Sequence, residues 1–327
     1  MQSTDFNPHT IQSCRLNHWM CDVNDFGVLA VTGSDAYSFL QGQTTCDFKQ
    51  LNSDTWIMGA LCNPKGRVIS IFYAVATESG FLLIVPVSTL NIVLNRLTMF
   101  ILRSDVTLAN VTTQWHMIGF SLSPATTCPF SLPPARGVIS QSDRYLLQCH
   151  STNKQPKRYL ILCREKRLKE TLSQLEHMEL TNTDSTEWHL HEIANGIPVI
   201  TEKTSEIFIP QMLNLDLLNA ISFEKGCYTG QEIVARTQHL GTLKRRMFVL
   251  AGSSQSPAEP GTIIVSQSNQ AQHRVGQVVR SAVSGKQLIM LAVILKSAAG
   301  LTDLCINTPE ASALSMMTSF DPETPLP

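Results

Sequence analysis

The first part of the chain alternates apolar runs with stretches in which apolar residues recur every three or four positions. Residues 27–33 form a short apolar run that is typical of a buried strand. Ser34 follows directly and is expected to cap a helix that carries Tyr37, Phe39 and Leu40. The pattern therefore opens with a strand and a helix.

Two further apolar runs, residues 55–62 and 68–76, are joined by a stretch with turn chemistry. Residues 63–66 read Asn-Pro-Lys-Gly, and proline suits the second position of a β-turn while glycine suits the fourth. This pattern predicts a hairpin. A strand over 81–87 and a helix capped by Ser88 are expected to follow it.

The middle of the chain continues to alternate strands with helices. Residues 158–163 predict a compact strand, and residues 165–178 predict an amphipathic helix whose leucines share one face. Residues 187–195 predict another helix, ended by Gly196 and followed by Pro198. An alternation of this kind indicates an α+β fold.

Beyond residue 243 the pattern changes to short β-rich runs separated by glycine, serine and proline, which favours a small antiparallel barrel. The runs are residues 246–251, 262–265, 275–280 and 287–295. We expect an α+β region of two interleaved subdomains over residues 1–240 and a C-terminal β-barrel over 241–307. A loose tail is expected over 308–327, because four prolines follow Thr308.

Composition and charge narrow the class of protein. Hydrophobic residues make up 43% of the 327 residues and charged residues 16%, which is typical of a globular protein. The net charge of −1 argues against binding nucleic acid over the whole surface. No secretory signal is apparent at the start, and no uncharged apolar run approaches the roughly 20 residues that span a bilayer.

The nine cysteines are scattered, without a Cys-x-x-Cys pair. This spacing predicts neither a disulfide framework nor a zinc site nor an iron–sulfur cluster held by the chain itself. Reduced thiols in a cytoplasmic protein are the simpler interpretation.

Residues 225–232, Lys-Gly-Cys-Tyr-Thr-Gly-Gln-Glu, are the segment most suggestive of chemistry. Glycines on both sides of Cys227 indicate a tight loop. A tight loop can lift a side chain into a cleft, and Lys225 would favour the thiolate of Cys227 if the two groups lie within about 6 Å. The alternative is that Cys227 is a small buried hydrophobic residue, as most lone cysteines are.

This octapeptide, continued by Ile-Val-Ala-Arg, resembles the signature of the folate-binding YgfZ proteins, which are relatives of the glycine-cleavage aminomethyltransferase (T-protein). Further segments resemble the family in the expected order: residues 39–43, 66–67, 188–198 and 208–211. The resemblance implies α+β domains, one of them ferredoxin-like, around a central opening, with a C-terminal antiparallel β-barrel. It also implies that the region over residues 1–240 binds tetrahydrofolate.

The resemblance carries over to particular residues. It implies folate contacts for Trp188 and for Phe26, which stands where a relative has tryptophan, whereas without it core packing would be the preferred interpretation of both. Cys227 is then the key residue, with Lys225 tuning its charge. The residues expected to support the motif are Gly226, Tyr228, Gly230, Gln231, Glu232 and Arg236.

Some of these residues have more than one interpretation. Glu232 and Arg236 lie four apart, so we expect a helical ion pair that props the loop, while a general base at Glu232 is the minor alternative. The basic run Lys244–Arg246 could meet a polyglutamate tail, tRNA or an acidic partner, or simply be solvated.

Three functions follow as hypotheses. The first is a cytoplasmic folate-binding protein that supports maturation or repair of iron–sulfur enzymes and thereby tRNA modification. Its partners would be iron–sulfur assembly or client proteins, with no need for direct nucleic-acid binding and no membrane. The second is a folate-dependent one-carbon (aminomethyl) transferase, and the third is a thiol redox protein.

Overall fold

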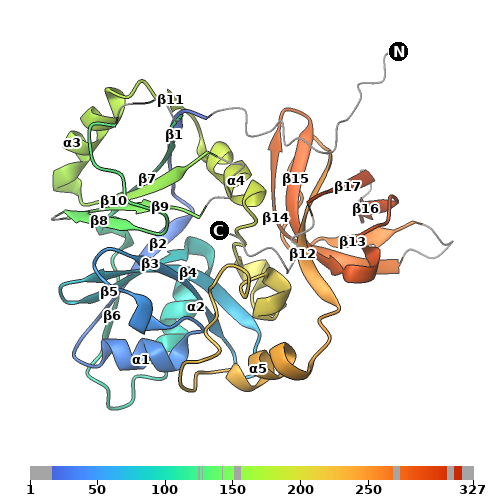
Figure 1. The fold of residues 1–327 in the computed structure, drawn as a ribbon, viewed down its shortest axis with the longest axis horizontal. Coiled ribbons are helices and arrows are strands. Elements are labelled where there is room, and N and C mark those ends of the chain that lie inside the picture. The colour runs from blue at the N-terminus through green and yellow to red at the C-terminus, as the bar shows by residue number, and fades with distance from the viewer. Residues whose placement is uncertain are drawn as a thin grey trace.

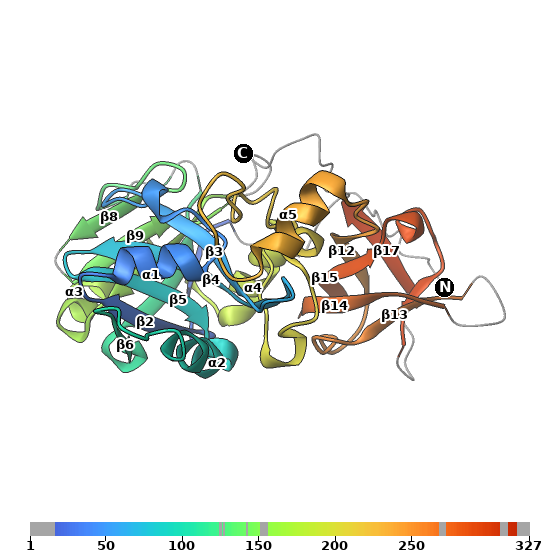
Figure 2. The ribbon, with the colours of Figure 1, turned by 90° about the horizontal axis from the view of Figure 1, so that it is seen from below.

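The structure is a computed structural model that describes residues 17–123, 126, 128–141, 143–150, 156–267, 273–307 and 313–318. These residues form two open sheets with helices packed on them, and a closed barrel (Figure 1). Seen from below, the two open sheets lie at one end of the long axis and the barrel at the other (Figure 2). The predicted α+β architecture with a C-terminal antiparallel barrel is confirmed.

The first open sheet has five antiparallel strands in the order β3-β4-β5-β2-β6. They are β2 (Phe26–Thr32), β3 (Trp56–Cys62), β4 (Val68–Thr77), β5 (Gly80–Pro86) and β6 (Thr107–Asn110). Helices α1 (Ala36–Gln43) and α2 (Val87–Thr98) bury their apolar residues against this sheet. The predicted hairpin between β3 and β4 is confirmed, since the Gly66 N–H donates to the Asn63 carbonyl oxygen at 2.9 Å.

The two predicted serine caps are wrong. Helix α1 begins after Asp35, and the Ser34 hydroxyl instead donates to the Asp105 carboxylate at 2.9 Å. Helix α2 begins after Pro86, so Ser88 lies inside its first turn. The N-cap residues, Asp35 and Pro86, make no side-chain capping hydrogen bond, so a preference for serine at caps does not reveal where these helices begin.

The second open sheet has six strands in the order β11-β1-β7-β10-β9-β8. They are β1 (Trp19–Asp22), β7 (His116–Ser121), β8 (Val138–Gln141), β9 (Arg144–Gln148), β10 (Arg158–Cys163) and β11 (Thr181–Asn182). Helix α3 (Glu165–Glu176) packs on it through an apolar cluster that includes Leu175. Helix α4 (Ser185–Ala194) contacts both β1 and the barrel strand β14.

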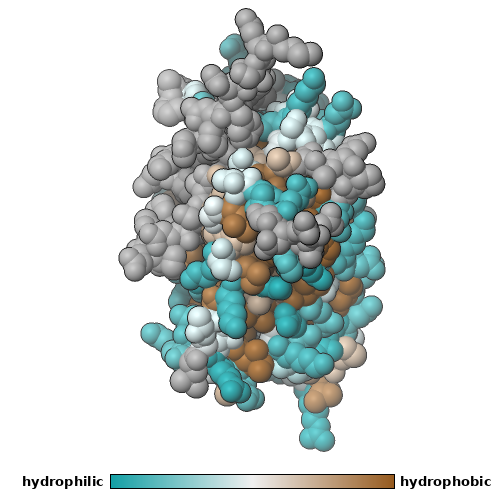
Figure 3. All heavy atoms as spheres, turned by 90° about the vertical axis from the view of Figure 1, so that its right-hand side faces the viewer, coloured by the Kyte–Doolittle hydropathy of each residue, from teal (hydrophilic) through white to brown (hydrophobic). Residues whose placement is uncertain are grey.

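The barrel closes in the order β12-β15-β14-β13-β16-β17, with antiparallel neighbours. Its strands are β12 (Arg245–Ser253), β13 (Ile263–Ser266), β14 (His273–Ser284), β15 (Gln287–Leu295), β16 (Leu304–Ile306) and β17 (Ala313–Thr318). The expectation of a loose tail from 308 is therefore wrong for residues 313–318, because β17 pairs with β12 and closes the barrel. Viewed from the barrel end, hydrophobic surface is interspersed with hydrophilic side chains (Figure 3).

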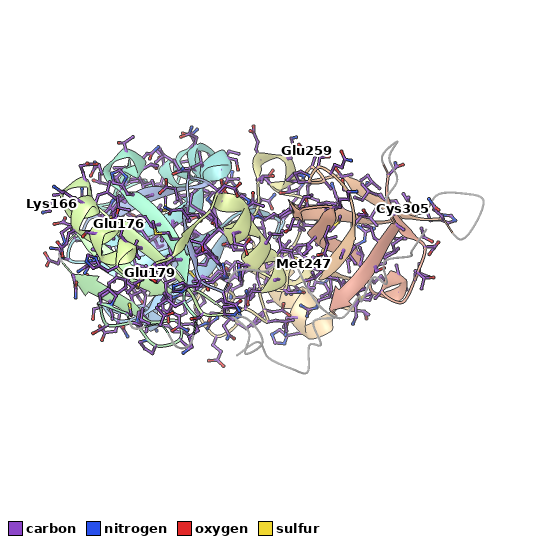
Figure 4. All side chains as sticks on the ribbon, turned by 90° about the horizontal axis from the view of Figure 1, so that it is seen from above. Lys166, Glu176, Glu179, Met247, Glu259 and Cys305 are labelled. Atoms are coloured by element: carbon purple, nitrogen blue, oxygen red, sulfur yellow. The ribbon has the colours of Figure 1, made fainter. Side chains whose placement is uncertain are left out.

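One apolar cluster runs through all three sheet systems and includes residues of β1, β4, α4, β12 and β15. At the junction with the barrel, the Asn214 side-chain amide donates to the Met247 carbonyl oxygen at 2.9 Å. Met247 lies where the barrel meets the α+β part, whereas Cys305 lies within the barrel (Figure 4). Arg246 makes a two-pronged ion pair with Asp216 there, with both N–O distances 2.7 Å.

The connecting segments contain short 3-10 helices. They are η1 (Phe48–Gln50), η2 (Thr112–Gln114), η3 (Glu202–Thr204), η4 (Pro210–Leu213) and η5 (Lys296–Ala298). In the described part of the chain, no helix is both long and apolar enough to cross a membrane.

Candidate functional site

The loop that carries Cys227 is built on a glycine with a left-handed backbone. Gly230 has φ +85° and caps helix α5 (Gln231–Leu240). A Cβ atom at Gly230 would lie 2.5 Å from the Asn63 carbonyl oxygen, because the loop packs flush on the β3–β4 turn. Gly226 differs, since a Cβ there would meet nothing within 4 Å. Only the second of the two flanking glycines is required by the packing.

The same loop is fastened to the end of α1. The Thr229 N–H donates to the Gly42 carbonyl oxygen at 3.3 Å, and the Thr229 hydroxyl donates to Gln43 at 3.2 Å. The Lys225 ammonium donates to the carbonyl oxygens of Thr44 at 2.9 Å and Cys46 at 2.6 Å. These two hydrogen bonds anchor the loop to the segment that follows α1. Burial lowers the pKa of the Lys225 ammonium to about 8.

Cys227 itself is exposed, whereas the other cysteines of the described chain are buried or half-buried. The alternative of a buried, structural Cys227 is therefore wrong. The hydrogen bonds of Lys225 go to two carbonyl oxygens, and its ammonium also lies 5.3 Å from the centre of the Tyr228 ring. Tuning of the thiol by Lys225 remains a prediction.

The motif-supporting residues have separate positions. The Tyr228 N–H donates to the Gln231 side-chain oxygen at 3.3 Å, which closes the loop on itself. The ring of Tyr228 is buried. Glu232 and Arg236 are exposed on α5, and no ion pair joins them among the described residues, so the predicted prop is wrong.

Other family-like segments converge on this loop. The Arg67 guanidinium donates to the Ile207 carbonyl oxygen at 2.6 Å, and the Val68 N–H donates to that of Phe208 at 2.8 Å. The Gln211 amide donates to the Val234 carbonyl oxygen of α5 at 2.7 Å. Segments 39–43 and 66–67 therefore contact the octapeptide, and segment 208–211 contacts the helix that follows it, although they are far apart in sequence.

The Trp188 segment lies elsewhere. Helix α4 begins at an N-cap in which the Asp184 carboxylate accepts from the Thr186 N–H at 2.8 Å. The Trp188 side chain is buried: it packs so closely on β7 that a Cβ at Gly119 would lie 2.3 Å from the indole. The Arg158 guanidinium lies 5.1 Å from the centre of the Trp188 ring. The Trp19 and Trp188 rings meet edge to face, with their centres 6.4 Å apart.

Polar atoms of this buried group lack partners. Within the described residues, neither the Trp188 indole N–H nor the Nε and Nη1 atoms of Arg158 have a hydrogen-bond partner. Arg158 is only 1% exposed, and its Nη2 donates to the His150 carbonyl oxygen at 3.0 Å. Buried donors without partners are costly, so they mark a place where a ligand with acceptor atoms is favoured.

Phe26 is buried at the start of β2, with its ring centre 6.3 Å from that of Tyr73. It belongs to the same apolar cluster as Trp188 but also lines a separate pocket of about 310 Å³ with Asn24 and His116. The structure thus places both predicted folate contacts in the core, as their alternative interpretation foresaw. Their contact with folate stays a prediction.

Charged side chains complete the cluster around α4. The buried carboxylate of Glu192 pairs with Arg280 of the barrel strand β14. Asp25 pairs with His189, and Arg280 lies 3.7 Å from Asp25. The hydrogen bond from His189 lowers the pKa of the Asp25 carboxyl, so this carboxylate stays ionised at neutral pH.

Sequence reasoning missed Arg158, Glu192 and Arg280. For the two arginines the available signal was a charge beside apolar residues, because Arg158 opens the run 158–163 and Arg280 directly follows Val278 and Val279. Such a charge must find a buried partner or a ligand.

The structure does not bring the sulfur of Cys227 to Trp188. The Cys227 loop contacts α1 and the β3–β4 turn, whereas α4 contacts β1, β14 and β15. Figure 1 shows α4 beside the upper sheet and α5 at the lower edge of the molecule. The site is therefore two regions, the Cys227 loop (residues 225–230) and the Trp188 cluster (Trp188, Arg158, Glu192, Arg280, Asp25 and His189).

Comparisons with known proteins define the class. The model of the GCVT N-terminal domain matches residues 4–121. The glycine cleavage system aminomethyltransferase T from Bartonella henselae superposes with a TM-score of 0.71 at 12% identity, covering 94% of this chain and 88% of that one. The fold is therefore that of the aminomethyltransferase T class.

Curated relatives identify the family more closely. The tRNA-modifying protein YgfZ of Colwellia psychrerythraea (strain 34H) is 30% identical over 309 residues, which are 92% of each chain. The tRNA-modifying protein YgfZ of Aliivibrio fischeri (strain MJ11) is 31% identical over 248 residues, or 76% of each chain. The chain belongs to the family of tRNA-modifying YgfZ proteins.

Proposed function

We propose that this protein binds tetrahydrofolate at the Trp188 cluster and supports the maturation or repair of iron–sulfur enzymes in the cytoplasm. tRNA modification then depends on it indirectly, through the iron–sulfur enzymes that carry out that modification. Cys227 acts on a partner protein, with Lys225 tuning its charge. Direct binding of nucleic acid is not required.

The observation that carries the folate assignment is the set of buried donors in the Trp188 cluster. A pterin is flat and presents ring nitrogens and a carbonyl oxygen along its edge, which are acceptors for Arg158 and for the Trp188 indole N–H. The ionised carboxylate of Asp25 could accept from the pterin amino group. The donors of Arg158 and Trp188 and the acceptor of Asp25 match the chemistry of a pterin edge, which supports assigning these residues to hold it.

The role of Cys227 is supported by its exposure and by the rigidity of its loop. Both ends of the loop are tied to α1 and to the β3–β4 turn, so the sulfur is held at a defined place on the surface. An exposed sulfur on a fixed loop is accessible to another protein, whereas a buried one is not.

Folate binding is tested by replacing a buried arginine. Arg158→Lys keeps the charge but removes the planar donor set, and we expect it to weaken tetrahydrofolate binding about tenfold in calorimetry. Arg144→Lys is the matched control, because Arg144 is also a buried arginine over an aromatic ring, at 5.8 Å from Phe130. Equal affinities in both variants and the wild type would contradict the assignment.

The cellular role is tested by complementation. A strain that lacks the gene receives the wild type or Cys227→Ala, and iron–sulfur enzyme activities and tRNA methylthiolation are measured. We expect the variant to accumulate normally and to fail to restore either readout. Full restoration by Cys227→Ala would remove Cys227 from the proposal.

A second candidate function is folate-dependent one-carbon transfer, favoured by the fold and by two carboxylates, Asp25 and Glu192, within the cluster. Incubation of the protein with tetrahydrofolate and an aminomethyl donor distinguishes the two functions. Formation of methylene-tetrahydrofolate at a rate that depends on Asp25 would favour the transferase.

A further inference from the structure

A groove of about 600 Å³ lies between residues 132–136, which precede β8, and the adjoining ends of β9 and β10. Its cationic residues are Arg136 and Lys157, with the imidazole of His150 deeper in. Pro133 and Tyr159 contribute apolar wall. No carboxylate is present among the described residues that line it. The groove therefore combines positive charge with apolar lining.

His150 supplies an independent sign of a ligand. Its side chain is 4% exposed, and its Nε2 atom has no hydrogen-bond partner in the described part of the chain. Its burial, and to a lesser extent the positive charges of Arg136 and Arg158, lower the pKa of the imidazole to about 4. An unpartnered imidazole with the positive charges of Arg136 and Arg158 acting on it is suited to a hydrogen bond with an anion that these charges attract.

The groove adjoins the Trp188 cluster through Arg158. The carbonyl oxygen of His150 accepts from Arg158, the same guanidinium that lies over the Trp188 ring. Cys149 also lines the groove, and the charges of Arg158 and Glu192 both act on its thiol. Arg158 therefore contacts both His150 of the groove and Trp188 of the cluster.

Arg136 limits how far an anion can extend. It also lines a second groove, of about 390 Å³, whose walls include the carboxylates of Asp47 and Glu224. The Arg136 guanidinium is anchored there by donating to the Leu218 carbonyl oxygen at 2.5 Å. An anionic chain that starts at the cluster meets favourable charge up to Arg136 and unfavourable charge beyond it.

We propose that the Arg136–His150–Lys157 groove binds a short carboxylate-bearing chain. This inference rests on the proposed folate site, and it assigns the chain as the γ-glutamyl tail of that folate. The apolar wall suits the methylene groups of such a tail, and the cations suit its carboxylates. A bare phosphodiester would leave the apolar wall without a partner.

The test compares two ligands on one protein. Tetrahydrofolate with three γ-glutamyl residues should bind the wild type at least fivefold more tightly than tetrahydropteroate, which lacks glutamate. Lys157→Gln is exposed and retains the fold, and we expect it to weaken the triglutamyl ligand about fivefold at low salt. Its affinity for tetrahydropteroate should stay within twofold of wild type.

Lys169→Gln is the matched control, since Lys169 is an exposed lysine on α3 outside the groove. Equal wild-type affinities for the two ligands, or an unchanged triglutamyl affinity in Lys157→Gln, would overturn the assignment. If neither pterin ligand binds, the folate proposal fails by itself. Tri-γ-glutamate peptide alone then decides: binding that Lys157→Gln weakens supports the groove, and no binding overturns it.

Discussion

The Cys227 loop and the Trp188 cluster hold their key side chains by different physical means. The loop relies on backbone: a left-handed glycine, a carbonyl that only glycine can approach, and a lysine bound to two carbonyl oxygens. The cluster relies on buried charge, with Glu192 paired to Arg280 and Arg158 lying over an indole. The loop exposes its sulfur, whereas the cluster buries every charge except part of Asp25 and His189.

This difference indicates which substitutions each region tolerates. In the loop, the exposed Cys227 can be replaced without loss of stability, whereas Gly230 cannot. In the cluster, any change that leaves one member of a charged pair alone is costly, because a buried charge without its partner keeps the full desolvation penalty. We therefore expect substitutions that change backbone conformation to destabilise the loop most. Substitutions that remove one member of a charged pair should destabilise the cluster most.

The largest effect is expected in the cluster. Arg280→Leu leaves the carboxylate of Glu192, which is 1% exposed, without its partner. We expect a loss of about 3–5 kcal/mol in the free energy of unfolding, measured by urea denaturation. The double variant with Glu192→Gln should recover most of it. Lys203→Gln, which breaks an exposed pair with Glu259, should change stability by less than about 1 kcal/mol.

A pH effect follows next in size. Unfolded His150 takes up a proton below about pH 6.5, but folded His150 does so only near pH 4. The unfolded state therefore binds more protons in this window, and stability falls as the pH drops from 6.5 to 4, by about 3 kcal/mol from this residue. Urea denaturation of wild type and His150→Gln across this range should give stabilities that diverge by that amount. Equal changes in the stability of the two proteins over this pH range would contradict the lowered pKa of His150.

The loop is probed by a pair of glycine substitutions. Gly230→Ala forces a left-handed backbone on alanine and places its Cβ 2.5 Å from a carbonyl oxygen, so we expect a loss of about 2 kcal/mol. Gly226→Ala meets open space and should change stability by less than about 0.5 kcal/mol. Similar losses in thermal unfolding of the two variants would show that the loop is not held as described.

The smallest effect is expected at the sulfur itself. Cys227→Ser removes nothing from the core and should leave the free energy of unfolding within about 0.5 kcal/mol of wild type. Cys62→Ser, at a thiol that is 1% exposed, should lose about 2 kcal/mol by comparison. A loss at Cys227 as large as that at Cys62 would place the sulfur in the core after all.

Strands of both the α+β region and the barrel were predictable where the apolar pattern was continuous. Arg158–Cys163 has the predicted bounds, and β15 does as well. Short strands such as β6 and β11 escaped prediction, because their residues are mostly exposed and show no alternation. Strand β17 escaped because the prolines around it outweighed its own pattern.

Candidate residues were predictable in kind but not in arrangement. The octapeptide indicated a tight loop with an accessible thiol, and both features are present. The target of Lys225 was not predictable, since the two carbonyl oxygens that it binds lie about 180 residues earlier in the chain. The Arg158–Trp188 contact depends on the pairing of β10 and β7, which no local pattern specifies.

The pairing of Glu192 with Arg280 also sets an order of events during translation. The two residues are 88 positions apart, so at about 5–20 residues per second the acid leaves the ribosome roughly 4–18 seconds before its arginine. During that interval Glu192 either stays in contact with water or, if helix α4 is buried, takes up a proton. An ionised Glu192 can therefore be buried beside its arginine only after β14 of the barrel has been synthesised.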